Sequence, residues 1–185
     1  GTMKVSVSNI EFVPKEHWNF PPFFTIQPVS ATKEKQLKLW RELIIDYCIH
    51  QNTFSIVPAN FKFFKNSSIN RNLTQEGIDI IITSLIQSGN AEWEDNVKSN
   101  LRIIWKSPET LAAEIYTWAC TNEILGTVYT IYELHSGDEN VDSGFHGMDP
   151  VIVRRALEIL EVNKKCKIIR GGSIEEDGVK FLAIA

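Results

Sequence analysis

The sequence has few cysteines and no long apolar run. Its three cysteines, Cys48, Cys120 and Cys166, lie far apart and are odd in number, which argues against a disulfide framework and predicts buried free thiols in a reducing compartment. No apolar run approaches the roughly 18 residues that a membrane span needs. No signal-peptide pattern is present, and the native start is expected at Met3, after two added residues. A cytoplasmic protein is therefore predicted.

The sequence also lacks the patterns of catalytic chemistry. It has no nucleophile motif, and no glycine-rich phosphate loop follows a predicted strand. Its four histidines fall in different predicted elements, and none has metal-ligand spacing with a cysteine. We predict no catalytic residues, no cofactor and no metal, so an unrecognised hydrolase is the weakest of the functional alternatives.

One acidic loop comes near a calcium-binding pattern. Asp138, Asn140 and Asp142 occupy the first, third and fifth places, and Asp149 occupies the twelfth. The sixth place, which needs glycine for a sharp turn, holds Ser143, and the bidentate glutamate of the twelfth place is missing. A solvated acidic loop is the better interpretation.

Basic residues are too few for a typical nucleic-acid-binding protein. Residues 1–106 hold 12 Lys and Arg against 10 Asp and Glu, a net charge of +2, whereas residues 107–185 hold 7 against 13, a net charge of −6. The predicted helix 74–88, which would read DNA in a winged helix, contains no Lys or Arg. Because these residues make most phosphate contacts, no nucleic-acid partner is expected. A winged-helix DNA-binding transcription regulator remains the alternative function.

Periodic apolar residues predict the same order of elements twice. Each half has a helix, a short strand, a second helix and a two-stranded hairpin, which is the order of a winged helix. The first half is expected to have a helix from Ser30, a strand at 54–57, a weaker helix at 66–73, a helix at 74–88 capped by Thr74 and stopped by Gly89, and a hairpin at 91–105. The second is expected to have helices starting at Ser107-Pro108 and Asp149-Pro150 and strands at 128–132, 166–170 and 179–184.

The predicted fold class is therefore α+β, with two tandem winged-helix domains at residues 30–106 and 107–185. Residues 1–29 form a separate N-terminal arm. No Gly/Ser linker divides the two domains.

The arm contains a proline and aromatic segment, with Trp18, Phe20, Pro21, Pro22, Phe23 and Phe24 as candidate partner-binding residues. Adjacent prolines predict an extended, polyproline-like strip that cannot bury all these rings by itself. It either covers its own domain or docks on another protein as a preformed peptide. If it docks, replacing Pro21, Pro22 and Phe24 by alanine should leave the isolated fold nearly unchanged. Trp18 could extend the docking contact or pack on its own domain.

Several blocks of the sequence together resemble the ESCRT-II subunit family, specifically its small subunit. The Tyr132-Glu133-Leu134 and Phe145-His146-Gly147 blocks are specific in combination. The matching blocks run in colinear order at residues 20–28, 35–37, 89–93, 128–134, 145–149, 155–157 and 178–181.

This resemblance implies tandem winged helices in a non-catalytic scaffold that sorts ubiquitinated cargo into multivesicular bodies. It implies that the proline and aromatic segment docks on two larger ESCRT-II subunits and that the second winged helix recruits an ESCRT-III subunit. Contact with the endosomal membrane would be indirect, through the complex. The family motif is often Pro-Pro-x-Tyr, and here Phe24 replaces the tyrosine and removes its hydroxyl.

Overall fold

The computed structural model describes residues 10–184, so the start predicted at Met3 lies outside the described residues. The chain divides into two compact units between Trp105 and Lys106. The predicted domain boundary lies one residue later. Within residues 10–184, no helix is both long and apolar enough to span a membrane.

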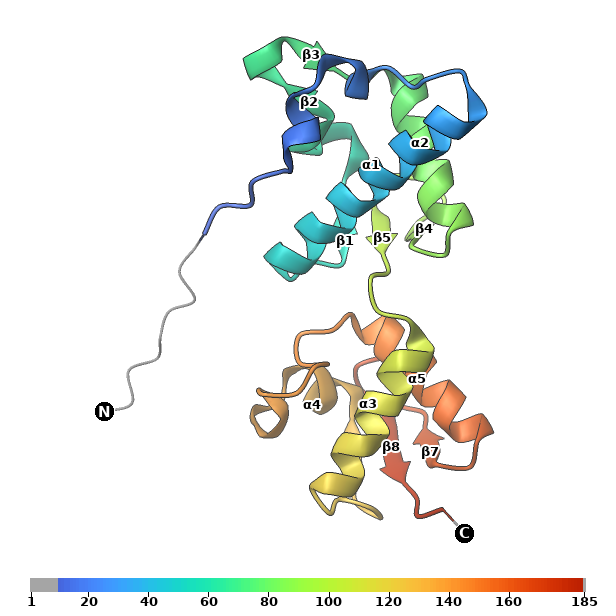
Figure 1. The fold of residues 1–185 in the computed structure, drawn as a ribbon. Coiled ribbons are helices and arrows are strands. Elements are labelled where there is room, and N and C mark those ends of the chain that lie inside the picture. The colour runs from blue at the N-terminus through green and yellow to red at the C-terminus, as the bar shows by residue number, and fades with distance from the viewer. Residues whose placement is uncertain (1–9, 185) are drawn as a thin grey trace, which may run out of the picture. The chain divides into compact units, whose positions relative to one another are not determined.

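The first unit packs two helices on a small antiparallel sheet (Figure 1). The strands of this sheet lie in the order β1-β5-β4. Its elements are α1 (Ser30–Gln51), β1 (Ser55–Ile56), α2 (Gln75–Gln87), β4 (Ala91–Trp93) and β5 (Leu101–Ile103), with 3-10 turns at Glu16–Asn19, Pro21–Phe24, Pro58–Asn60, Lys62–Phe64 and Ser67–Ile69.

The predicted ends of the second helix are confirmed. The Thr74 hydroxyl accepts a hydrogen bond from the Gly77 amide at 3.1 Å, which satisfies one unpaired donor of the first turn. Gly89 follows the last turn with a φ of +79°, a conformation that glycine adopts without steric cost.

The helix predicted weakly at 66–73 is wrong. That segment is a hairpin of β2 (Lys65–Asn66) and β3 (Arg71–Asn72), joined by a 3-10 turn at Ser67–Ile69. The Asn66 side chain accepts a hydrogen bond from the Ser68 amide, and Asn70 ends the turn at a φ of +51°. These local side-chain bonds compete with helix formation.

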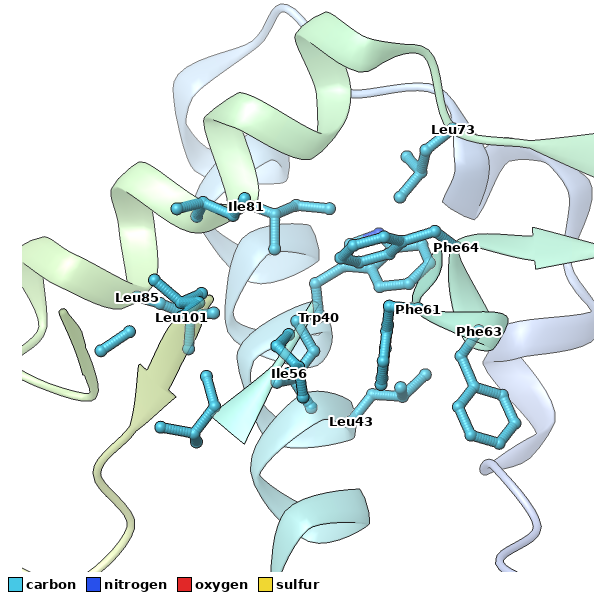
Figure 2. Close-up of a cluster of buried hydrophobic side chains, with 14 of the residues drawn as sticks. Trp40, Leu43, Ile56, Phe61, Phe63, Phe64, Leu73, Ile81, Leu85 and Leu101 are labelled. Carbon is cyan, nitrogen blue, oxygen red and sulfur yellow. The ribbon is translucent and has the colours of Figure 1, made fainter. Parts of the chain in front are cut away.

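Aromatic rings fill much of the first core. Trp40 on α1 lies at its centre, with Phe61 and Phe64 beside it and Ile81 and Leu85 entering from α2 (Figure 2). The α1 stripe predicted from the sequence therefore faces a core to which the segment between β1 and α2 contributes three phenylalanines and Leu73.

The second unit has an antiparallel sheet in the order β6-β8-β7 and three helices. Helices α3 and α5 lie side by side within it (Figure 1). Its elements are α3 (Pro108–Thr121), β6 (Val128–Thr130), α4 (Ile131–Ser136), α5 (Pro150–Val162), β7 (Cys166–Ile169) and β8 (Gly178–Phe181), with a 3-10 turn at Asp138–Asn140. The α+β class is confirmed, and each unit fits a winged helix.

Both predicted helix starts in this unit are confirmed, but its strands end earlier than predicted, at Thr130, Ile169 and Phe181 in place of positions 132, 170 and 184. Ser107 and Asp149 accept hydrogen bonds from backbone amides and are followed by proline. The strand predicted over 128–132 ends at Thr130, where α4 begins. Thr130 and Glu133 form a capping box, with the Glu133 amide 3.1 Å from the threonine hydroxyl, and this local pair favours helix over strand at Ile131.

Replacing Thr130 by alanine should destabilise the second unit by about 1 kcal/mol, because the Glu133 amide loses its side-chain partner. Urea unfolding of residues 106–185 measures the change. Thr127→Ala is the matched control, since Thr127 is exposed and does not cap a helix. Equal effects of the two substitutions would contradict the capping role.

The cysteines differ from the prediction at one position. Cys48 and Cys166 are buried, and burial raises the pKa of each thiol to about 12. Cys120 is exposed. Because the thiolate is the reactive form and both raised pKa values keep the buried thiols protonated at pH 8, only Cys120 should react rapidly with Ellman's reagent in the folded chain. Denaturant should release the other two thiols, and their rapid reaction without denaturant would contradict the buried assignment.

Candidate functional site

The proline and aromatic segment forms two consecutive 3-10 turns, Glu16–Asn19 and Pro21–Phe24. The predicted extended strip is therefore wrong. The Phe23 amide donates to the Phe20 carbonyl at 2.9 Å, and the Thr25 amide donates to the Pro22 carbonyl at 3.1 Å. A polyproline helix has no such internal bonds. Proline is tolerated at the start of the second turn because its missing N–H would have no partner there.

Phe23 and Phe24 are buried in the core of their own unit, each with 4% of its surface exposed. The Phe23 ring stacks on Trp40 at a centroid distance of 4.2 Å, and Phe24 meets the same indole edge-on at 5.5 Å. Truncating a buried phenylalanine to alanine costs about 3–5 kcal/mol. The expectation that Phe24 can be replaced without affecting the fold is therefore corrected.

Gln36 on α1 holds the second turn in place. Its buried side-chain amide lies 3.2, 3.0 and 2.9 Å from the carbonyl oxygens of Pro22, Phe23 and Thr25, and its carbonyl accepts from the Gln27 amide at 2.9 Å. These bonds satisfy the Phe23 and Thr25 carbonyls and add a second bond to the Pro22 carbonyl, which already accepts from the Thr25 amide. Sequence reasoning missed this role, although a glutamine four residues before Trp40 lies on the same helix face and was a usable signal.

Trp40 adds a further bond to the same turn, because its indole Nε1 donates to the Phe23 carbonyl at 3.0 Å. The ring that stacks on Phe23 therefore also fixes its backbone. A buried indole N–H usually needs such a partner.

Trp18 packs on its own domain. Its indole Nε1 donates to the Phe63 carbonyl at 2.9 Å, and the two rings meet edge-on at 5.5 Å. The buried Asn66 side chain donates to the Trp18 carbonyl at 3.0 Å. The sequence left open whether Trp18 extends the docking contact or packs on its own domain, and in the isolated chain it packs on its own domain.

Phe20 differs from its neighbours because 60% of its surface is exposed. It links the two turns in an extended conformation, with φ −91° and ψ 112°. Pro22 is also exposed, and Pro21 is half-buried. The segment therefore presents one large apolar ring on a backbone fixed on both sides, which suits insertion into an apolar pocket.

His17 lies beside this segment, with its ring 4.9 Å from Phe23 in an edge-on contact. Burial lowers the pKa of His17, and the nearby Lys15 lowers it further, while Glu42 opposes the shift. The imidazole is therefore neutral at pH 7, in keeping with its apolar neighbour.

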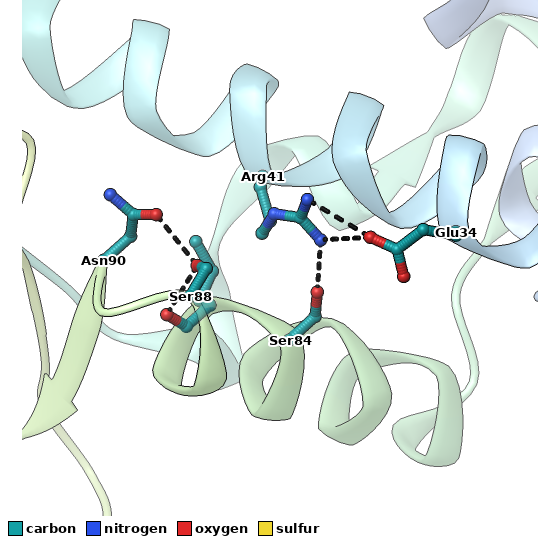
Figure 3. A network of polar contacts seen from close by, with 6 residues as sticks. Glu34, Arg41, Ser84, Ser88 and Asn90 are labelled. Atoms are coloured by element: carbon teal, nitrogen blue, oxygen red, sulfur yellow. Dashed lines mark hydrogen bonds and ion pairs between the residues drawn. The ribbon is translucent and has the colours of Figure 1, made fainter.

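Helix α2 does not present a nucleic-acid-binding face. A nearby cation, Arg41 on α1, donates to the Ser84 hydroxyl at 2.6 Å and pairs with Glu34 at 3.4 Å (Figure 3). Ser84 is buried beneath this contact. Exposed Glu76 and Asp79 lie on the same helix and would repel phosphate.

The acidic loop does not converge on a cation. Asn140 is buried and donates to the carbonyls of Glu133 and Leu134, at 2.9 and 2.6 Å. The Asp149 carboxylate accepts from the Val151 amide at 2.9 Å and so caps α5. Two of the four candidate ligands therefore have other bonds, and no group of three or more His, Cys, Asp or Glu side chains within residues 10–184 could hold a metal ion.

Comparison with known proteins gives one consistent family. Residues 17–149 match the family described as ESCRT-II complex subunit. Vacuolar protein sorting-associated protein 25 of Arabidopsis thaliana is 37% identical over 172 residues, which cover 92% of this chain and 96% of that protein. Its Danio rerio namesake is 38% identical over 167 residues, covering 89% and 95%.

A solved structure agrees with these sequence matches. The crystal structure of subunit VPS25 of the endosomal trafficking complex ESCRT-II superposes with a TM-score of 0.78 at 25% identity and covers 90% of this chain and 97% of that one. The resemblance predicted from the sequence blocks is thereby confirmed, and the chain belongs to the family of ESCRT-II complex subunits.

Proposed function

We propose that the chain is a non-catalytic scaffold subunit of ESCRT-II in the endosomal sorting of ubiquitinated cargo into multivesicular bodies. The observation that supports a docking role best is Phe20, a large apolar side chain exposed between two anchored turns. The chain also superposes, with a TM-score of 0.75 over 91% of its length, on a subunit in the crystal structure of endosomal complex ESCRT-II, described as VPS22/VPS25/VPS36.

The docking partners in this proposal are the counterparts of VPS22 and VPS36, the two larger ESCRT-II subunits. Phe20 and Pro22 make the direct contact, with Pro21 and the edge of Trp18 beside them. Phe23 and Phe24 act indirectly, because their burial fixes the backbone that presents Phe20. Such preorganisation lowers the entropy lost on binding.

The second unit recruits an ESCRT-III subunit in this proposal, and the chain is cytoplasmic and reaches endosomal membranes only through the complex. Ile152 on α5 is buried in the core of the second unit, so it is not part of the recruiting surface in this proposal.

Replacing Phe20 by alanine should weaken binding to the VPS22–VPS36 pair by roughly 30-fold, which corresponds to a hot-spot loss of about 2 kcal/mol. The melting temperature of the lone chain should hardly change, because Phe20 is largely exposed. Calorimetric titration and thermal unfolding measure the two effects. Phe23→Ala is the contrasting control, since it should lower the melting temperature sharply. Unchanged affinity of the Phe20 variant would refute its direct role.

Residues 106–185 alone should bind the ESCRT-III subunit with the affinity of the full chain, because the second unit is compact and has its own core. Circular dichroism first checks that each fragment is folded. Fluorescence anisotropy then measures binding to the ESCRT-III subunit. Binding confined to residues 1–105 would show that recruitment belongs to the first unit instead.

A further inference from the structure

The outer face of the β6-β8-β7 sheet has a composition that the proposed docking and recruitment do not explain. The strand register places Val128, Lys180 and Lys167 in one cross-strand row, and Thr130, Gly178 and Ile169 in another. The alternate positions Val179 and Phe181 are buried in the core. Because side chains alternate between the two faces of a strand, both rows point outward.

An apolar strip crosses this outer face. Val128 and Ile169 stay 52% and 46% exposed on the two outer strands, with Gly178 on the central strand between them. A side-chain carbon added to Gly178 would lie 3.4 Å from Val128 Cγ1 and 3.6 Å from Ile169 Cβ. The glycine therefore lets the two aliphatic side chains approach each other across the middle strand and form one continuous strip.

Two lysines lie beside the strip, directly opposite each other. Lys167 and Lys180 are register partners, and both are exposed. Like charges in such cross-strand positions destabilise a sheet. Neither lysine forms a salt bridge with a described carboxylate, and the Glu161 carboxylate at the edge of β7 accepts from the Ile168 amide at 2.6 Å.

In the sheet of the first unit, the equivalent cross-strand pair has opposite charges. There Arg102 on β5 pairs with Glu92, its register partner on β4, at 2.6 Å. The same face of the second sheet thus keeps an apolar strip and two cations that no described carboxylate neutralises, in a half of the chain whose net charge is −6.

We propose that this face, made by Val128, Thr130, Lys167, Ile169, Gly178 and Lys180, binds an acidic amphipathic segment of a partner protein. Carboxylates of the segment pair with the two lysines, and its aliphatic side chains cover the strip. A protein segment is favoured over an anionic membrane because this face carries two lysines, fewer than the clusters of about four to eight basic residues that recognise anionic bilayers. The inference goes beyond the proposed recruitment, since it concerns the chemistry of the ligand and can be tested with a synthetic one.

The test is an NMR titration of the ¹⁵N-labelled full chain with an amphipathic peptide that carries leucine on one helix face and glutamate beside it. The amides of Lys167, Ile169 and Lys180 should shift and saturate. Lys167→Glu should weaken binding about tenfold, because it replaces attraction by repulsion. The melting temperature of this variant should stay equal or rise, since the introduced carboxylate would face Lys180 with the opposite charge.

Matched control variants separate the contribution of charge from that of the aliphatic strip. Lys98→Glu makes the same charge change on an exposed loop of the first unit and should leave binding unchanged. Ile169→Thr removes an aliphatic side chain but keeps a β-branched residue, and should weaken binding. The proposal is overturned by an equal response to a peptide with lysine in place of glutamate, or by no shift at millimolar peptide. It is also overturned by Lys167-dependent binding to phosphatidylserine vesicles without peptide binding, which would assign the face to a membrane.

Discussion

The contact between the Pro21–Phe24 turn and α1 is the constraint on which the first unit depends. Trp40 stacks on one ring of the turn, meets the other edge-on and binds its backbone, while Gln36 satisfies the neighbouring carbonyls. The segment that resembles a detachable docking arm is thus part of the core. Folding of the unit and presentation of Phe20 are coupled, because the bonds that stabilise the core also fix the exposed ring.

A buried ion pair joins the elements of the second unit, whereas aromatic contacts join those of the first. Asp177 is buried, pairs with Arg154 on α5 and accepts from the Gly171 amide at 2.7 Å, so it joins the turn between β7 and β8 to a helix. Its own carbonyl accepts from the Ile131 amide, where α4 begins. A buried ion pair contributes little net stability, but removing one partner leaves an uncompensated charge. This arrangement fixes the geometry around the sheet.

The two units therefore share a plan and differ in the surfaces that they leave available. The first exposes one aromatic ring and has a charge-paired sheet face, and the second exposes an aliphatic strip beside two lysines that pair with no described carboxylate. Neither surface brings together groups that could perform catalysis. Both are suited to contacts with other proteins, which agrees with membership of a family of complex subunits.

The sequence by itself determined the α+β class, the repeated order of elements and most helix starts, because caps such as Ser107 and Asp149 act within a few residues. The same locality explains why the capping box of Thr130 and Glu133 ends the strand that was predicted over 128–132. Only the tertiary structure decided which rings of the N-terminal segment are exposed, since Phe23 meets a tryptophan 17 residues away. It likewise decided that Lys167 lies opposite Lys180, because strand register is set by packing between segments distant in sequence.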